Sequence, residues 1–160
     1  MPVRFSLFAL VFVGVLSGCA RSPQASTPPS ASGPKTHVVC PTQALAAGCA
    51  FSGGSGIQAA VDAPADGDTI RIRPGTYTPA GVRDVPYKIH PILGFVVVDG
   101  KRLSLIGEPG TVLDGSAGPR TTGLVIHRAN VDVQGLTFTG FKFDVEEDET
   151  YEGHGIFAID

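Results

Sequence analysis

The chain has 160 residues, of which 12 are basic and 15 acidic, and its formal net charge is −3 at pH 7. The basic residues form no patch along the sequence, so the composition argues against nucleic acid as a partner. Three cysteines are present, and the first of them, Cys19, belongs to an N-terminal segment with the features of an export signal.

Residues 1–19 predict a lipoprotein signal peptide. Arg4 supplies a positive charge, and the apolar run 5–16 that follows is too short to span a membrane but suits a signal core. Residues 16–19, Leu-Ser-Gly-Cys, resemble the bacterial lipobox. We therefore expect Cys19 to carry a diacylglyceryl group that holds the protein outside the cytoplasm, on the cell membrane or the outer membrane. The alternative is an ordinary cleaved signal with an incidental cysteine.

Residues 20–36 are rich in Ser, Pro, Ala and Thr and contain almost no apolar bulk. Because such a segment cannot bury enough surface to offset the entropy of ordering, we expect a disordered tether, followed by one folded domain at 37–160. Cys40 and Cys49 lie at the start of that domain. In an exported protein they allow a single disulfide, which we expect in preference to free thiols.

The stretch 55–62 predicts a short amphipathic helix. Ser55 and Gln58 have the spacing of a capping box, in which two side chains satisfy backbone N–H groups at the helix start. One helical face is apolar and consists of Ile57, Ala60 and Val61. Pro64 should end the helix after about two turns, because proline cannot continue it.

A half-buried strand is predicted directly after the helix. Ile70 and Ile72 point to one face, while Thr69, Arg71 and Arg73 point to the other. A helix of two turns is not stable alone, so its apolar face must pack on the strands that follow.

This succession resembles a known family. The helix GIQAAVD, then GDTIRIRPGTY, then LSLIGEPGTVLDG are similar to the start of right-handed parallel β-helix proteins of the pectin-lyase-like superfamily, over residues 53–160. The resemblance implies an all-β solenoid whose N-terminal mouth is capped by the helix. It does not imply one activity, since the superfamily contains lyases, hydrolases, epimerases and adhesins.

The later segments fit stacked coils. Residues 78–93 contain three prolines and are predicted to be a long loop or an insertion, and 95–98 is apolar on both faces. Leu103 and Leu105 match Val131 and Val133 at a separation of 28, and the ends of the next strands match at 25. A β-sandwich is the alternative, but the Asp-Gly pairs lie at expected corners rather than in tight hairpins.

Residues 153–160 predict one further coil, after which no closing helix or polar cap follows. Because an open solenoid end leaves unpaired backbone groups, we expect the sequence to be the first part of a longer protein. The alternatives are self-association through the open end and an unstable truncated fragment.

An acidic cluster precedes that last coil. Asp144, Glu146 and Asp148 could hold calcium, an ion that β-helix pectate lyases use to bridge enzyme and acidic sugar. The cluster lacks the glycine-punctuated spacing of a calcium loop, and this favours a solvated acidic loop between coils over a calcium site. Calcium is the one cofactor that the sequence suggests.

Three residues are candidates for contact with a substrate. His154 stands in a Gly-His-Gly tripeptide similar to that of polygalacturonases, but the companion motifs Asn-Thr-Asp and Asp-Asp do not occur here, so a turn histidine is the alternative. Arg71 and Arg73 could line a sugar-binding groove or simply form the wet face of a sheet. His90 and His127 have no carboxylate or cysteine neighbour in a recognisable spacing, and no catalytic residue is assigned.

The sequence thus predicts a lipid-anchored, extracytoplasmic parallel β-helix protein that binds or processes polysaccharide in its full-length form. Any activity would be that of a polysaccharide lyase or a glycoside hydrolase, with the active site mostly outside this chain. The alternative is a non-catalytic surface scaffold or adhesion solenoid.

Overall fold

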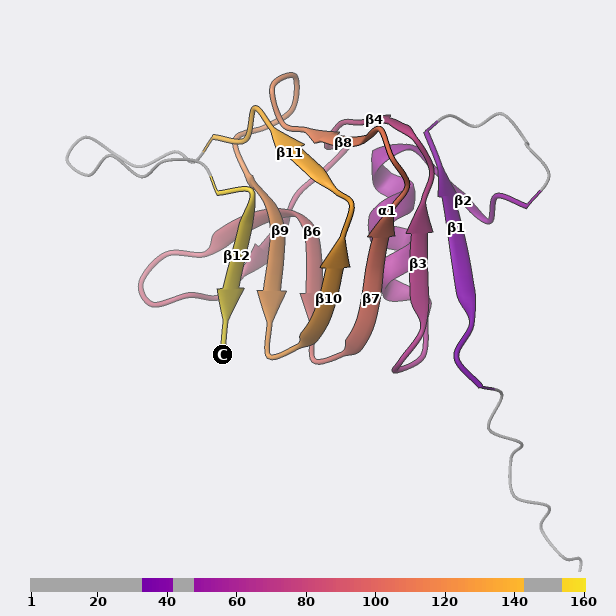
Figure 1. Ribbon diagram of the computed structural model, residues 1–160. Helices are drawn as coiled ribbons and strands as arrows, with labels where there is room; N and C mark the ends of the chain where they lie inside the picture. The colour runs from indigo at the N-terminus through magenta and orange to yellow at the C-terminus, as the bar shows by residue number, and fades with distance from the viewer. Residues whose placement is uncertain (1–32, 42–47, 143–153) are drawn as a thin grey trace, which may run out of the picture. The chain divides into compact units, whose positions relative to one another are not determined.

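The computed structural model describes residues 33–41, 48–142 and 154–160. Cys19, the predicted tether up to residue 32 and the acidic residues Asp144, Glu146 and Asp148 lie outside these ranges. The described part is mostly β, with parallel sheets and one helix (Figure 1). Within it, no helix has the length and the apolar character that a membrane span needs.

Three sheets contain all the described strands. Sheet A has the order β10-β7-β3-β1-β2, sheet B the order β11-β8-β4, and sheet C the order β12-β9-β6-β5. Every pairing is parallel except that of β5 with β6. Sheet A comprises β1 (Thr36–Cys40), β2 (Phe51–Ser52), β3 (Thr69–Ile72), β7 (Arg102–Gly107) and β10 (Asn130–Gln134). Sheet B comprises β4 (Gly75–Tyr77), β8 (Thr111–Asp114) and β11 (Thr137–Thr139). Sheet C comprises β5 (Arg83–Val85), β6 (Ile92–Asp99), β9 (Thr122–His127) and β12 (Ile156–Ile159).

The chain runs through sheets A, B and C in that order three times, and each run is called a pass here. The first pass contains β3, β4 and β6, the second β7, β8 and β9, and the third β10, β11 and β12. The predicted register is confirmed, because Val131 lies opposite Leu103 and Thr139 opposite Asp114. Parallel pairing between passes replaces the hairpins that a sandwich would require.

Glycines mark one corner of this arrangement. Gly107 is the last residue of β7 and Gly135 directly follows β10, again at a separation of 28, and a Cβ at Gly135 would lie 2.2 Å from the carbonyl oxygen of Gly107. The backbone of Gly135 also has φ of +66°, a conformation that glycine adopts without strain. Successive passes can therefore approach closely at this corner only where side chains are absent.

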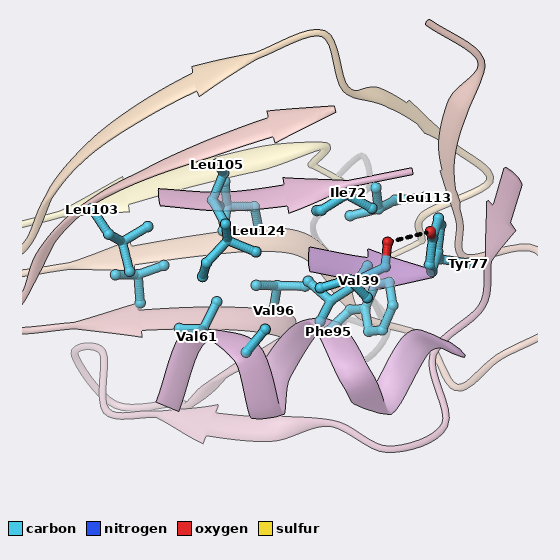
Figure 2. Packing of buried hydrophobic residues seen from close by; sticks show 14 of the residues in the cluster. Val39, Val61, Ile72, Tyr77, Phe95, Val96, Leu103, Leu105, Leu113 and Leu124 are labelled. Atoms are coloured by element: carbon cyan, nitrogen blue, oxygen red, sulfur yellow. Dashed lines mark hydrogen bonds between the residues drawn. The ribbon is translucent and has the colours of Figure 1, made fainter. Parts of the chain in front are cut away.

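The main core lies between the three sheets and α1 (Gly53–Asp62) (Figure 2). The predicted alternation holds, since Ile70, Ile72, Leu103 and Leu105 are all buried. The apolar helical face is also confirmed: its three residues are at most 1 % exposed and pack with the strand residues. Burial of such side chains is the main source of stability for strands as short as these.

The predicted capping box is wrong. The helix begins at Gly53, two residues earlier than expected, with Ser52 as N-cap and no side-chain capping bond. Gln58 instead lies at the helix–sheet contact and bonds the backbone of Val97 at 3.0 and 2.7 Å. The Ser-x-x-Gln spacing therefore falls inside the helix, and Gln58 ties α1 to sheet C.

Residues 78–93 are more ordered than predicted. They contain β5, which pairs antiparallel with the first residues of β6 and forms a hairpin. A second apolar cluster, separate from the main core, lies beneath this hairpin and consists of Val85, Ile92, Val97 and Val125. Tyr87 extends it to the third pass, where its ring meets Phe157 of β12 edge-on at 5.5 Å. The predicted insertion thus covers one face of sheet C.

The first strands are joined covalently. The sulfurs of Cys40, at the end of β1, and of Cys49 are bonded, with their Cα atoms 5.9 Å apart. This bridge encloses residues 42–47, which are outside the described ranges.

Candidate functional site

A cleft of about 510 Å³ lies beside the C-terminal end of α1. It is bordered by β5, by the turn between β6 and β7, and by the end of β9. Six charged residues line it and define what we call the charged cleft: Asp62, Arg83, Asp84, Asp99, Lys101 and Arg128. His127 completes its polar lining, and its apolar lining consists of Val61, Val85, Pro86 and Val97.

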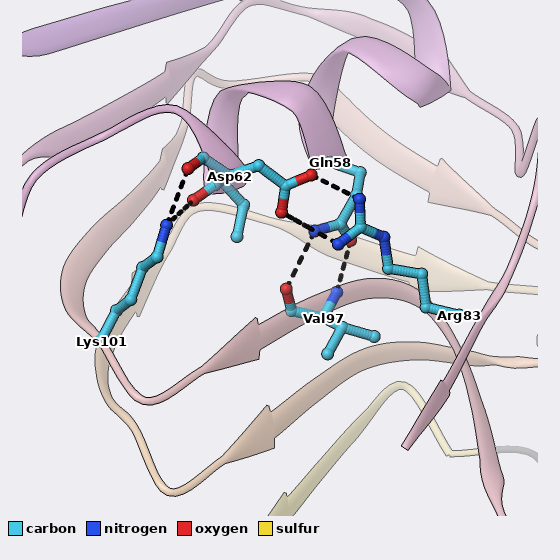
Figure 3. A network of polar contacts seen from close by, with 6 residues as sticks. Gln58, Asp62, Arg83, Val97 and Lys101 are labelled. Carbon is cyan, nitrogen blue, oxygen red and sulfur yellow. Dashed lines mark hydrogen bonds and ion pairs between the residues drawn. The ribbon is translucent and has the colours of Figure 1, made fainter.

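Asp62 anchors the helical side of the charged cleft. Its Oδ1 accepts hydrogen bonds from Gln58 Nε2 at 2.9 Å and from Arg83 Nη1 at 3.1 Å, and its Oδ2 accepts from Arg83 Nη2 (Figure 3). The two bonds from Arg83 are bidentate, a geometry that fixes both side chains. Because Gln58 is also bonded to Val97, this network links α1, β5 and β6.

The side chain of Lys101 binds the C-terminal end of α1. Its Nζ donates to the carbonyl oxygens of Val61 and Asp62, both at 2.9 Å (Figure 3). The last carbonyls of a helix have no partner within the helix and carry partial negative charge, so an ammonium group there is favourable. The lysine thereby holds the β6–β7 turn against α1.

Asp99 organises the opposite side. Arg128 Nη2 donates to its two carboxylate oxygens at 2.9 and 3.0 Å, and His127 Nδ1 lies 3.1 Å from Oδ1. The backbone of Arg128 has φ of +48°, which is uncommon outside glycine, and it leaves the strand direction at this point. Asp99 and His127 are register partners across β6 and β9.

The sequence showed no carboxylate near His127 in a recognisable spacing, yet the structure places Asp99 beside it. Spacing along a single segment does not reveal the partner, because it comes from the preceding pass. The separation of 28 residues that aligns Leu103 with Val131 also aligns Asp99 with His127. Applied to the charged residues, the same period would have found this contact.

The predicted substrate residues do not meet. Arg71 lies on β3 of sheet A with its Nη1 3.9 Å from Glu108 Oε1, and Arg73 is exposed just after that strand. His154 precedes β12 of sheet C, and its ring lies 5.3 Å from that of Phe157. The two arginines and the histidine are thus on different sheets, and none of them lines the charged cleft.

No group of three or more potential metal ligands occurs among residues 33–41, 48–142 and 154–160. The predicted calcium ligands Asp144, Glu146 and Asp148 fall outside these ranges, as does the predicted lipidation site Cys19. The predictions of a calcium site and of a lipid anchor therefore stay predictions.

A second carboxylate centre lies away from the charged cleft. Asp68 is 3 % exposed and accepts hydrogen bonds from the backbone N–H groups of Lys35 at 2.8 Å and of Ala65 at 3.2 Å. His37 Nε2 lies 2.9 Å from the Oδ2 atom of Asp68. The bond from Lys35, followed by that from His37, holds the pKa of Asp68 below its ordinary value of 3.8.

Tyr77 is the largest fully buried side chain. Its hydroxyl group lies 3.3 Å from the carbonyl oxygen of Val39 (Figure 2). It also lies 2.9 Å from the carbonyl oxygen of Arg73. Burial, aided by the charge of Glu108, raises the pKa of Tyr77 to about 12. Asp68 and Tyr77 stabilise the fold, whereas the charged cleft presents its groups to solvent.

The charged cleft is therefore the candidate ligand site that we consider further. It combines fixed donors and acceptors with an apolar lining, at a volume typical of small-molecule pockets. Comparison with known proteins adds no name to it, because no family model, no curated protein and no solved structure matches this chain.

Proposed function

We propose that this chain forms the first coils of a right-handed parallel β-helix. The proposal is supported by three sheets that the chain enters in a repeated order, and by strands that pair in parallel at a recurring separation of 28. It is also supported by α1, which packs on β1, β2 and β6 at the start of this arrangement. In such a fold each pass covers the apolar side chains of the one before it.

On this fold, we propose that the protein is a lipid-anchored polysaccharide-binding protein of the cell envelope, with the charged cleft as its carbohydrate site. The observation that carries the proposal is the preorganised alternation of donors and acceptors in the cleft. A sugar hydroxyl both donates and accepts, so it can bond a carboxylate and a neighbouring guanidinium at the same time. Val85, Pro86 and Val97 offer apolar contact to the C–H faces of a sugar ring.

Binding is favoured over catalysis by the state of the carboxylates. Asp62 is held by Arg83 and Gln58, and Asp99 is held by Arg128. A glycosidase needs one carboxylic acid that delivers a proton and a second that attacks or activates water. Carboxylates bonded to guanidinium groups are suited to accept hydrogen bonds from hydroxyls instead.

The test of carbohydrate binding uses the full chain, purified in detergent in the form produced by an exporting host. Affinity electrophoresis against a panel of soluble polysaccharides should show retardation by at least one neutral or acidic polymer. Arg83→Ala should weaken the retardation about tenfold, because it frees Asp62 and removes bidentate donors from the cleft. Arg71→Ala, an exposed arginine on sheet A, is the matched control and should bind as the unmodified chain does.

The result with this panel of polysaccharides decides between carbohydrate binding and a non-catalytic scaffold, two functions that the same fold could serve. A chain that is retarded by no polysaccharide contradicts carbohydrate binding and favours a non-catalytic scaffold. Equal weakening by Arg83→Ala and Arg71→Ala would place the carbohydrate site outside the charged cleft.

The anchor is tested separately. Cells that express the chain are grown with an alkyne-tagged fatty acid, and the label should appear on the protein and sediment with membranes. Cys19→Ser should abolish both the label and the sedimentation, because the cysteine thiol is the acceptor of the lipid. Label that persists in Cys19→Ser would contradict the lipobox.

A further inference from the structure

We infer that the charged cleft selects a neutral, hydroxyl-rich glycan over a polyuronate or any other polyanion. The inference rests on the proposed carbohydrate function and adds the substrate class to it. It is drawn from how the charges in the cleft are distributed and paired.

The formal charges of the cleft cancel. Its lining contains three acidic residues, Asp62, Asp84 and Asp99, and three permanent cations, Arg83, Lys101 and Arg128. A polyanion approaching this surface gains no net attraction from it. The chain as a whole has a formal charge of −3, which adds repulsion at long range.

The cations already have partners. Arg83 is bonded to Asp62 through both terminal nitrogens, Arg128 is bonded to both oxygens of Asp99, and Lys101 is bonded to the helix carbonyls. A uronate carboxylate could displace one of these partners, but that exchange replaces one charge-assisted bond by another without gain. It could also bond the N–H groups that remain free, but there it would lie close to a carboxylate that is already present.

The remaining hydrogen-bonding capacity suits hydroxyl groups. Two of the three ammonium protons of Lys101 bond the helix, and Arg83 directs two of its five N–H groups at Asp62, so each keeps donors for a ligand. Asp84, on β5, is exposed and adds a further acidic residue to the lining of the cleft. A group that both donates and accepts can use both kinds of site, whereas a carboxylate can use only the donors.

The experiment measures binding of the full chain, in detergent, to a neutral galactomannan and to polygalacturonate of similar length. The expected result is binding to the galactomannan that is roughly tenfold tighter than to polygalacturonate. The dissociation constant for the galactomannan should change by less than about twofold between low and high salt, because no net charge attraction is screened.

A charge variant sharpens the test. Asp84→Arg changes the cleft charge by two units and should raise the affinity for polygalacturonate about tenfold at low salt, an increase that high salt removes. Asp132→Arg makes the same change on β10, away from the cleft, and is the matched control. It should leave both affinities within about twofold of the unmodified values.

The possible outcomes are separable. If the unmodified chain prefers polygalacturonate and salt weakens that binding, the inference fails while carbohydrate binding stands. If neither polymer nor any other glycan of the panel binds, the proposed function fails and the inference fails with it. If Asp132→Arg raises the affinity for polygalacturonate as much as Asp84→Arg does, overall charge rather than the cleft governs selection, and the inference is wrong.

Discussion

The structure contains two contacts between a histidine and an aspartate that are almost equal in length and opposite in setting. His37 lies 2.9 Å from Asp68, whose side chain is 5 % exposed, and His127 lies 3.1 Å from Asp99, whose side chain is 49 % exposed. Asp68 is bonded mainly by backbone N–H groups, and Asp99 by a guanidinium group at the surface. The same residue pair thus stabilises the fold in one place and prepares a surface for a ligand in the other.

The two aspartates differ in which hydrogen-bond donors would lose their acceptor if the carboxylate were removed. Asp68 is itself buried, and removing its carboxylate takes the acceptor from the backbone N–H groups of Lys35 and Ala65 and from His37 together, which is costly. Removing the acceptor at Asp99 leaves groups that water can solvate, and exposed ion pairs contribute little to stability. The two aspartates therefore form a matched pair for mutagenesis.

The largest expected effect is that of Asp68→Asn. The amide can replace one carboxylate oxygen but presents N–H groups to the remaining donors, so we expect the melting temperature to fall by about 10 °C. Thermal unfolding followed by circular dichroism measures this. If Asp99→Asn lowered the melting temperature as much, the proposed difference between the two aspartates would be wrong.

A second effect is an acid limb of stability. The pKa of Asp68 is lower in the folded protein than its ordinary value of 3.8, so the unfolded chain binds more protons in this range. The stabilising contribution is therefore complete above about pH 4 and is lost as the pH falls through the folded pKa. Melting temperatures from pH 6 to pH 3 should show this loss.

Asp68→Asn should flatten that acid limb, and Asp99→Asn should leave it in place. Asp114, whose pKa is also lowered, by hydrogen bonds from Ser116, should account for part of what remains in the variant. If the melting temperature of Asp68→Asn falls with decreasing pH as much as that of the unmodified chain, Asp68 is not the cause of this loss of stability.

A smaller effect is expected at Tyr77. Because burial raises its pKa to about 12, the folded protein keeps a proton that the unfolded chain loses near pH 10, so stability should fall between these pH values. Tyr77→Phe should remove this alkaline loss and cost about 1 kcal/mol at pH 7, since the hydrogen bond to Arg73 disappears. Spectrophotometric titration and denaturant unfolding measure the two effects; a phenol that ionises near pH 10 in the folded protein would contradict the first.

The smallest effect on stability is expected for Asp99→Asn, at about 0.5 kcal/mol. The same variant should weaken glycan binding about tenfold, because Arg128 Nη2 loses the charged acceptor that fixes its position. Denaturant unfolding and affinity electrophoresis on one preparation provide the two numbers. A variant with reduced stability and unaltered binding would reverse the roles given to the two aspartates.

Much of the fold could be predicted because its signals are periodic. Alternation placed Ile70 and Ile72 in the core, and the separation of 28 placed Val131 opposite Leu103. Gln58 was misread, because Ser-x-x-Gln has the same spacing at a helix start and one turn inside a helix. Tertiary contact with Val97 decided between these, and no local pattern contains that information.

The charged cleft could not be predicted from the sequence for a similar reason. Its residues come from the end of a helix, a hairpin inserted in the first pass, and turns of two passes. A period relates residues at equivalent positions, which is why it could have paired Asp99 with His127, but it says nothing about an insertion. Arg83 reaches Asp62 only because β5 folds back along β6, and that antiparallel return has no counterpart among the described residues of the other two passes.

The same return has a consequence for how the molecule melts. In a stack in which each layer touches only its neighbours, layers can detach one at a time from an end. The β5–β6 hairpin is itself part of the first pass, and it packs against Val125 of the second and, through Tyr87, against Phe157 of the third. The hairpin thereby links all three passes, so we expect their described residues to unfold in a single cooperative transition and not one pass at a time.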